Sequence, residues 1–478
     1  MQLFHSKKCA CGKIHDAGFD RMNVGPGAVQ TVAEEVKRLG GTRVFLLADE
    51  NTVKVGGKRV ENLLTDAGIQ VVSCVLSGSV EPDEAGVADA TGQYDPACDL
   101  VVAVGSGVVN DIGKCVATDA GVPYLVVATA PSMDGYASGS AAMVVGGLKV
   151  SLPRRCASVL IGDTELLATA PNEMLIAGLG DMIAKYISIA EWRISHIVTG
   201  EYYCETVADA VRQALSVCVK NAKGLLTRDP AAIEAVFEGL VLSGAAMNYA
   251  GLSRPASGVE HYFSHVWDMR GLAFGTPVAL HGTQCAVGTL CAARIYDALR
   301  GIKPDKEKAL RAVKAFDGDE WFKTLRTFVG PGADAMIEAE ARDGKYDPRK
   351  HQARLSVLLD NWDAIQDVIR EEIPPEKEIR SLLASLGAPT APEGIGQKRS
   401  ELPLTFAATR DVRDKYVLSR LVWDLGLTDL ANACLLRENL KNRAVPGAKK
   451  RKSARTRTLF LILLKNRETE TPKASLYG

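Results

Sequence analysis

Four residues in the second half of the chain have the types and the spacing of a metal-binding set. Asp181 lies in an apolar helical stretch, directly after the string GLG. His261 and His265 are four residues apart in SGVEHYFSH, so one face of a helix presents both imidazoles. His281 stands in TPVALHGTQ, near the start of another predicted helix. A carboxylate in such small, apolar surroundings is costly without a partner, and a bound cation is one such partner.

Two imidazoles and one carboxylate are a common set of ligands for a divalent metal. Catalytic zinc takes three such ligands and leaves one position open, and nickel or iron also accepts imidazole and carboxylate. The ordinary alternative for any single histidine is a structural residue of the core or surface. The set as a whole favours a metal site, although His261 and His265 do not form HExxH, because Tyr, Phe and Ser stand between them.

A glycine turn in the first half has the form of a nucleotide-binding element. Residues 100–104 are an apolar strand, GSG follows at 105–107, a helix is predicted over 108–119, and residues 124–128 form the next strand. This order is a βαβ unit. The free N–H groups at the start of such a helix can hold the pyrophosphate of a dinucleotide. The alternative is a plain tight turn, because GSG is not GxGxxG.

Asp49 adds a second nucleotide signal. It ends the strand predicted over 44–48, where a carboxylate can accept hydrogen bonds from an adenosine ribose and would repel the 2′-phosphate of NADP. The alternative is that Asp49 caps the following turn, ADENT.

The predicted elements divide the chain into an α/β part and a helical part. Strands at 44–48, 70–76, 100–104 and 124–128 alternate with helices at 29–39, 60–67 and 108–119, which predicts a mostly parallel sheet of the Rossmann type. A hairpin around Gly146-Gly147 and one last strand lead to residue 163. Helices at 171–195, 205–225, 231–248, 259–269 and 278–298 then predict an all-α part. The expected domains are 1–163 and 164–443.

Composition excludes several classes of protein. The 478 residues carry 57 basic and 57 acidic side chains, so no basic excess points to nucleic acid. No apolar run of 18 residues predicts an integral membrane segment, and the N-terminus lacks a signal peptide, so we expect a cytoplasmic protein. The eleven cysteines are scattered as small buried hydrophobes. Cys9, Cys11 and His15 form a cluster whose metal-binding signal is weak without a second pair, and a structural or incidental role is favoured.

The last residues, 444–478, differ from what precedes them. A basic run is followed by the short apolar stretch at 458–464. A solvated tail is the favoured interpretation, and contact with an anionic surface is the alternative.

Five strings in one order carry a family resemblance: GSGVVNDIGK, TAPSMDGYAS, GLGDMIAK, SRPASGVEHYFSH and LHG. Over residues 9–440 the chain resembles the sn-glycerol-1-phosphate dehydrogenases, most of all their bacterial AraM-type branch. That branch belongs to the superfamily of glycerol dehydrogenases, iron-type alcohol dehydrogenases and dehydroquinate synthases. The resemblance implies the dehydroquinate synthase-like fold, a homodimer, NAD or NADP, and one divalent metal per subunit, zinc or nickel.

The resemblance also implies site residues. The family's metal ligands match Asp181, His261 and His281. Its substrate contacts match Asp134, Asp181 and His265. We assign Asp181 and His265 as catalytic, and either His265 or a bound water can supply the proton. Its cofactor contacts match these positions: Asp49, Gly107, Val108, Val109, Asn110, Asp111, Thr129, Ala130, Pro131, Ser132 and Ser138. A carboxylate such as Asp111 beside a pyrophosphate is electrostatically odd, so we expect a backbone contact or a bond to its own helix start.

The implied reaction is metal-dependent reduction of dihydroxyacetone phosphate to sn-glycerol 1-phosphate in the interdomain cleft. Arg254, seven residues before His261, is our candidate for binding the phosphate; its alternative is a surface or helix-capping arginine. Glycerol dehydrogenase and a dehydroquinate synthase-like enzyme are alternatives with the same metal and nucleotide sites. A silent nucleotide- or phosphosugar-binding regulator is the alternative of another class.

Overall fold

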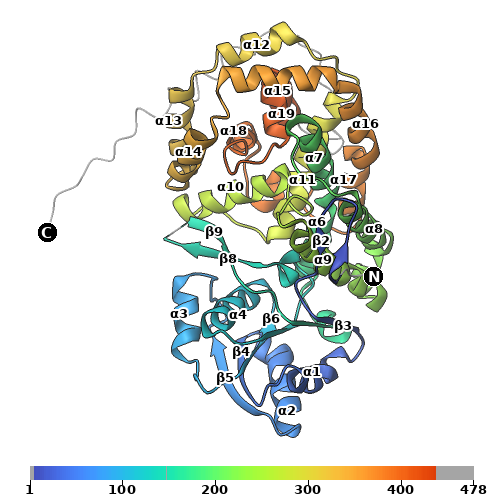
Figure 1. The fold of residues 1–478 in the computed structure, drawn as a ribbon, viewed down its shortest axis with the longest axis vertical. Coiled ribbons are helices and arrows are strands. Elements are labelled where there is room, and N and C mark those ends of the chain that lie inside the picture. The colour runs from blue at the N-terminus through green and yellow to red at the C-terminus, as the bar shows by residue number, and fades with distance from the viewer. Residues whose placement is uncertain (1–4, 147, 438–478) are drawn as a thin grey trace, which may run out of the picture. The chain divides into compact units, whose positions relative to one another are not determined.

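A six-stranded parallel sheet forms the first part of the protein (Figure 1). The structure is a computed structural model that describes residues 5–146 and 148–437. The strand order is β3-β10-β7-β6-β4-β5, and every neighbouring pair is parallel. The strands are β3 (Arg21–Gly25), β4 (Arg43–Asp49), β5 (Gln70–Leu76), β6 (Leu100–Gly105), β7 (Tyr124–Ala128) and β10 (Val159–Asp163).

Helices cover both faces of this sheet, as the continuous apolar strands predict. Val102 and Val104 of β6 pack in one core with residues of α1 (Val32–Arg38) and α2 (Lys58–Asp66). The alternate residues Val101 and Ala103 pack in a second core with α3 (Glu84–Gly92) and α4 (Gly107–Ala120). The predicted α/β fold is therefore confirmed.

Two small antiparallel hairpins lie outside the sheet. The hairpin predicted around Gly146 is present as β8 (Ser140–Val145) and β9 (Leu148–Pro153). The hairpin of β1 (Lys7–Lys8) and β2 (Ile14–His15) was not predicted, because its strands have only two residues each. Strand β3 was also missed: no strand was predicted before residue 44, but Arg21–Gly25 pairs with β10.

Residues 164–437 contain helices and no strand. The strand β10 ends at Asp163, yet residues up to Leu436 form one compact unit, so the boundary between two domains stays a prediction. The tail predicted over 444–478 lies outside the described residues. The helices are α5 (Thr164–Leu167), α6 (Asn172–Ile183), α7 (Lys185–Thr199), α8 (Glu205–Asn221), α9 (Pro230–Ala250), α10 (Val259–Phe274), α11 (His281–Leu299), α12 (Lys306–Lys314), α13 (Gly318–Val329), α14 (Gly332–Asp343), α15 (Pro348–Asp360), α16 (Trp362–Glu372), α17 (Glu376–Ser385), α18 (Leu402–Ala408), α19 (Leu418–Asp424) and α20 (Thr428–Leu436).

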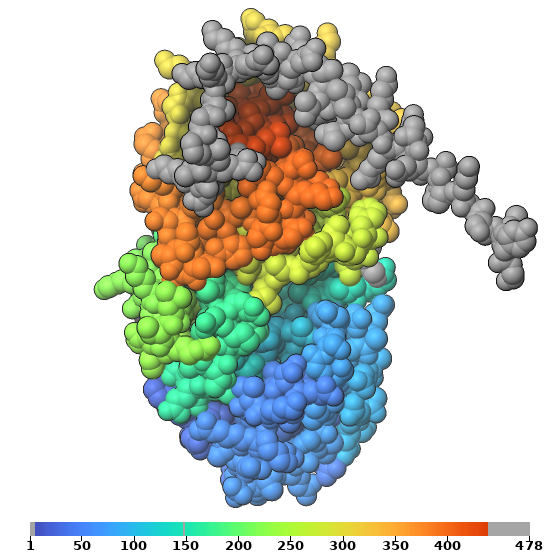
Figure 2. Space-filling view, turned by 180° about the vertical axis from the view of Figure 1, so that it is seen from behind, coloured from blue at the N-terminus to red at the C-terminus, as the bar shows by residue number. Residues whose placement is uncertain are grey.

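Short 3₁₀ and π segments complete the chain's elements. The 3₁₀ segments are η1 (Ala28–Thr31), η3 (Asp134–Ala137), η4 (Ala222–Thr227), η5 (Pro392–Ile395) and η6 (Arg399–Glu401), and a π turn, η2 (Val53–Gly57), precedes α2. Figure 2 shows the first part of the chain, in blue, at one end of the described residues, and the later residues, in yellow to red, toward the other end.

Two predicted helices need correction. The single helix expected over 171–195 is two helices, α6 and α7, which meet at Ala184. The helix expected from residue 278 begins only at His281, because Leu280 has extended backbone (ψ 139°) and precedes the first turn. His281 therefore opens a helix, where its backbone N–H needs no partner within that helix.

One helix, α9, is long and apolar enough to cross a membrane by length and composition. In the structure, 72% of its most apolar window is buried inside the protein. It packs against α6, α8 and η3, so α9 is the central helix of the helical part. No other described helix passes the same test of length and composition.

Candidate active site

The predicted metal ligands meet in one cluster. Asp181 comes from α6, His261 from α10 and His281 from the first position of α11. One ligand atom of each, with the Sγ of Cys285, lies within 4.8 Å of the others. The Oδ1 of Asp181 is 3.5 Å from the Nε2 of His261, and the Nε2 of His281 is 3.6 Å from the Sγ of Cys285. The residues fit a divalent ion of the zinc or nickel kind.

Close backbone contact between α6 and α11 brings Asp181 and His281 together. A Cβ at Gly282 would lie 1.9 Å from the carbonyl oxygen of Ala177. A Cβ at Gly178 would lie 1.8 Å from the carbonyl oxygen of Pro131, at the end of the loop after β7. Only glycine fits at such distances. Gly282 therefore sets how closely α6 approaches α11, and Gly178 sets how closely α6 approaches the loop after β7.

Neighbouring side chains orient both imidazoles. The Oε1 of Glu260 is 2.7 Å from the Nδ1 of His261, and the Oγ of Ser264 is 3.2 Å from the Nδ1 of His281. Hydrogen bonds at Nδ1 leave each Nε2 directed at the cluster, which is how metal-binding histidines are usually held. Glu260, Ser264 and Cys285 were not predicted; the string VEH and the four-residue spacing of His281 and Cys285 were the signals available.

The cluster favours positive charge. Burial alone would raise the pKa of Asp181, but Lys185 and His261 hold it well below its usual range. Burial would lower the pKa of His261, yet Cys285, Asp181 and Glu260 raise it well above the usual value. The pKa of His281 is also raised, against the effect of burial, by Cys285 and Asp181. Without a metal, protons supply the positive charge that a divalent ion would bring.

We therefore expect metal affinity to fall as the pH is lowered. The raised pKa values mean that His261 and His281 hold protons which a metal must displace, and each displaced proton weakens binding about tenfold per pH unit below the raised pKa. Calorimetric titration with Ni²⁺ across the neutral range measures this. The His281→Ala variant should show a shallower dependence, and an affinity independent of pH would contradict the assignment.

A buried lysine joins Asp181 to Asp134. The Nζ of Lys185 is 3.0 Å from the Oδ1 of Asp181 and 2.8 Å from the Oδ2 of Asp134. The backbone N–H of Asp134 donates to the Oδ2 of Asp181, and Ser243 donates to the Oδ2 of Asp134. The structure thus brings Asp134 next to the metal set. Lys185 was missed, although its place four residues after Asp181 in DMIAK was a signal.

His265 is a half-buried neighbour of the metal set. Burial, and after it the charges of Arg413 and Lys149, lower its pKa well below the usual value. The ring is therefore neutral at neutral pH and can accept a hydrogen bond. Lys149 comes from β9 and pairs with Asp268 of α10, and Arg413 donates to the Oγ of Ser151 in β9.

Arg254, the candidate for binding the phosphate, is buried among other residues of the helical part. Its guanidinium is 1% exposed and is held by Glu201, Ser195 and the carbonyl oxygen of Tyr416. It lines a cavity of about 370 Å³ in the helical part. Its donors bind the protein itself, and because it is buried it is not the surface arginine of the alternative either. Phosphate binding by Arg254 stays a prediction.

The glycine turn lies where the strand order of the sheet reverses. β5 follows β4 on one side, whereas β6 and β7 extend the sheet on the other side of β4. Ligands of open α/β sheets bind at this point, outside the carboxyl ends of the strands. Gly105 ends β6, Gly107 and Val108 open α4, and Thr129 and Ala130 follow β7, so these predicted cofactor positions lie at the carboxyl ends of two neighbouring strands.

Several predicted cofactor side chains also bind the protein. The Oδ1 of Asp49 accepts from the N–H groups of Asn51 and Thr52, so Asp49 caps its turn as the alternative held. Asn110 accepts from the hydroxyl of Tyr124, and Ser138 accepts from Lys114. Asp111 bonds the backbone N–H of Ala142 on β8, and its burial raises its pKa to about 6.

The remaining predicted cofactor positions lie in the same two segments. Val109 and Thr129 are buried, Pro131 contacts Gly178, and the Sδ and Cε of Met133 lie beside Gly107. Ser132 is 8% exposed at the start of the polar loop. These segments offer mainly backbone groups to a nucleotide, as a glycine-turn site does.

Known proteins resemble this chain over most of its length. The family model described as "Iron-containing alcohol dehydrogenase" matches residues 23–171. A "Glycerol-1-phosphate dehydrogenase [NAD(P)+]" of Bacillus licheniformis is 32% identical over 343 residues, 70% of this chain and 85% of the relative. A protein of the same name from Methanosarcina acetivorans is 33% identical over 271 residues, 56% of this chain and 74% of the relative.

Solved structures share the fold. The crystal structure of a probable glycerol dehydrogenase from Sinorhizobium meliloti 1021 has a TM-score of 0.55 and 16% identity, covering 87% of this chain and 97% of that one. A 1,3-propanediol oxidoreductase structure has a TM-score of 0.58 and 18% identity with the same coverage. At these identities the likeness shows the dehydroquinate synthase-like fold alone.

Proposed function

The chain belongs to the glycerol-1-phosphate dehydrogenases, and from this premise we infer that it reduces dihydroxyacetone phosphate to sn-glycerol 1-phosphate with NADH or NADPH. The reaction is reversible. The observation that carries this proposal is the meeting of Asp181, His261 and His281 from three helices in a chain with such relatives. A regulator without activity has no need for this set.

We propose that Asp181, His261 and His281 hold the divalent metal, with the thiol of Cys285 beside them. A zinc or nickel ion at this position supplies Lewis-acid polarisation of the substrate carbonyl. Lys185 keeps Asp181 ionised and fixed in direction through their 3.0 Å contact. Asp134, held by Lys185 and Ser243, is placed to bind the free hydroxyl of the substrate.

The nucleotide is proposed to lie in the crevice at the reversal of strand order, with its pyrophosphate at the N-terminus of α4. The other carboxylate oxygen of Asp49, at the end of β4, is placed for the adenosine ribose. Reduction also needs a proton at the substrate oxygen. Neutral His265 is proposed to exchange that proton, because it can accept one from the alcohol when the reaction runs toward the ketone.

The phosphate-binding group is assigned to Arg413 and Lys149 in place of Arg254. Both are close enough to His265 to lower its pKa. Arg413 is half-buried, and one amino group of its guanidinium donates to the hydroxyl of Ser151. We propose that the other donors of the guanidinium bind the phosphate.

Replacing Arg413 by glutamine should raise the KM for dihydroxyacetone phosphate about 10- to 100-fold, the loss of about 1.5–3 kcal/mol from a charged hydrogen bond. The unphosphorylated ketone should be affected little. Arg326→Gln is the matched control, because Arg326 is an exposed arginine of α13 that pairs with Asp334 of α14. An equal effect on both ketones would exclude a phosphate contact.

The function is tested with the purified, metal-loaded protein, NADH or NADPH, and dihydroxyacetone phosphate. Turnover that requires the phosphate and yields sn-glycerol 1-phosphate in a stereospecific assay is expected. Faster turnover of dihydroxyacetone would make the protein a glycerol dehydrogenase. No turnover with any metal would favour the cyclase-like enzyme or the regulator.

Two further properties are proposed. A cytoplasmic location is supported by ten of the cysteines, from Cys9 to Cys291, whose thiols are free in the structure. A homodimer is supported by the family resemblance, and light scattering of the purified chain tests it.

A further inference from the structure

A second cluster of metal-binding side chains lies outside the active site. It contains Cys9, Cys11 and His15 from the N-terminal hairpin and Cys204 from the residue before α8. One ligand atom of each lies within 4.8 Å of the others. The fourth member comes from a position 189 residues after His15, which is why the sequence showed only three members of the set.

The distances fit a tetrahedral site. With metal–sulfur and metal–nitrogen bonds of about 2.3 Å and about 2.0 Å, tetrahedral zinc places two sulfurs about 3.8 Å apart and sulfur and nitrogen about 3.5 Å apart. The Sγ atoms of Cys9 and Cys204 are 3.7 Å apart. The Nε2 of His15 is 3.4 Å from the Sγ of Cys11 and 3.3 Å from the Sγ of Cys204.

The protein orients these ligands. The Nδ1 of His15 is 3.0 Å from the carbonyl oxygen of Tyr249, a bond that leaves Nε2 facing the three sulfurs. Within the hairpin, the N–H of Gly12 donates to Cys9 and the N–H of Cys9 donates to Lys13. Gly12 has φ +86°, a turn conformation that lets both cysteines of the CxCG string point to one side.

We propose that Cys9, Cys11, His15 and Cys204 bind a structural zinc ion. Three thiolates and one imidazole are a common zinc set, and four protein ligands leave no open position for a substrate. The site shares no residue with the set of Asp181, His261 and His281. It therefore adds a metal to the protein without adding a second catalytic centre.

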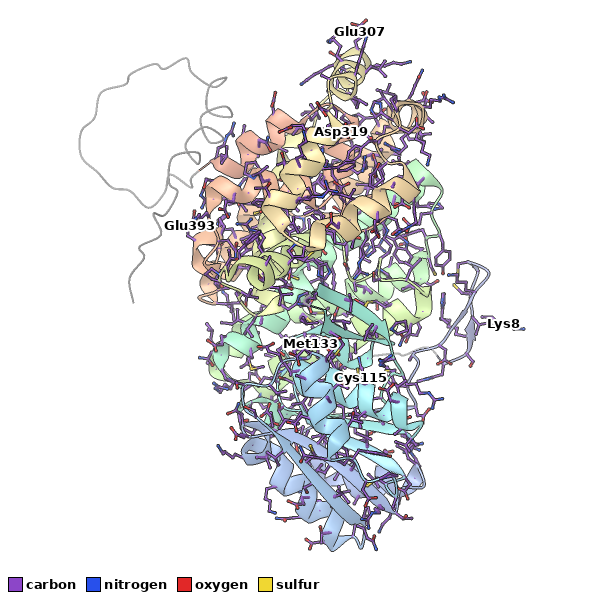
Figure 3. The ribbon with its side chains drawn as sticks, turned by 90° about the vertical axis from the view of Figure 1, so that its left-hand side faces the viewer. Lys8, Cys115, Met133, Glu307, Asp319 and Glu393 are labelled. Atoms are coloured by element: carbon purple, nitrogen blue, oxygen red, sulfur yellow. The ribbon has the colours of Figure 1, made fainter. Side chains whose placement is uncertain are left out.

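The ion joins the N-terminal hairpin to the helical part. Figure 3 shows the hairpin, with Lys8, at the edge of the protein. Besides the cluster, Lys13 donates to the carbonyl oxygen of Ala250, and Asn248 donates to that of Ala17. The chain then continues into β3, the edge strand of the sheet. A zinc ion thus fixes the N-terminal hairpin against α8 and α9, at the point where the chain continues into the sheet.

The test is the zinc content of the full-length protein purified with zinc. Wild type should hold about two equivalents per chain and His281→Ala about one. Adding Cys11→Ser to His281→Ala should remove the remaining equivalent, whereas Cys11→His, which keeps a ligand, should retain it. Cys156→Ser, which removes a half-buried thiol outside both clusters, is the matched control and should also retain it.

A second measurement does not depend on the folding of a cysteine variant. Titration of His281→Ala with a mercurial reagent should release its zinc in step with the modification of three thiols. The proposal is overturned if His281→Ala holds no zinc or if its zinc leaves without thiol modification. An intact mass lower by two hydrogens, which a Cys9–Cys204 disulfide would give, also overturns it.

Discussion

Replacing His281 by alanine lowers kcat/KM for dihydroxyacetone phosphate reduction by about 10³-fold or more. The variant loses one of three predicted ligands, and Lewis-acid stabilisation by a bound metal is worth several kcal/mol; about 4 kcal/mol corresponds to 10³-fold. His281 opens α11 and is half-buried, and alanine is a good helix former, so we expect the fold to be retained. The measurements are steady-state kinetics and metal content on the same preparation.

His196→Ala is the matched control for this result. His196 is exposed at the last turn of α7 and bonds the carbonyl oxygen of Glu201. Its removal should leave kcat/KM within about twofold, as for most surface substitutions. A His281→Ala enzyme that keeps full activity and full metal content would exclude His281 as a ligand.

Replacing Gly282 by alanine has the second largest expected effect. The new Cβ would stand 1.9 Å from the carbonyl oxygen of Ala177 and 3.2 Å from the Cβ of Asp181. Backbone cannot rotate away as a side chain can, so α6 and α11 must separate by about 1 Å, at a cost of about 1–3 kcal/mol. Because that shift moves Asp181 away from His281, we expect activity to fall about 10²-fold.

Thermal melting, metal titration and kinetics of Gly282→Ala together test this prediction. The expected pattern is a lower melting temperature, weaker metal binding and a reduced kcat. Gly318→Ala is the control, since its nearest side-chain atom would be 3.9 Å away at the start of α13. A Gly282→Ala protein with unchanged metal affinity would show that the helix crossing does not position the ligands.

The sequence predicted the sheet better than the helices that hold the site. Buried parallel strands are continuous apolar runs, so β5 and β7 were predicted with the bounds that the structure has. Strand β3 was missed because its residues, RMNVG, are half polar and lie at a sheet edge. The break at Ala184 was missed because the apolar pattern runs through it, and only tertiary packing divides α6 from α7.

The metal set was visible in the sequence for a different reason. Asp181, His261 and His281 are charged or titratable residues in apolar surroundings, which few structural roles tolerate. Lys185 and Glu260 are also charged residues in apolar surroundings. They were overlooked because Asp181 and His261, in the same two strings, already accounted for a polar function there. Cys204 could not be joined to Cys9 and Cys11, because that contact exists only after α8 and the N-terminal hairpin have packed.

The meeting of Asp181, His261 and His281 from three separate helices has a thermodynamic consequence. An unfolded chain holds these groups far apart, so an ion held by this set would bind the folded state alone and add to its stability by mass action. Free metal at 100 times its dissociation constant raises the free energy of unfolding by about 2.7 kcal/mol. The melting temperature of this enzyme is thus a function of the metal concentration around it, and a chelator added to a cell extract lowers the amount of folded enzyme as well as its rate.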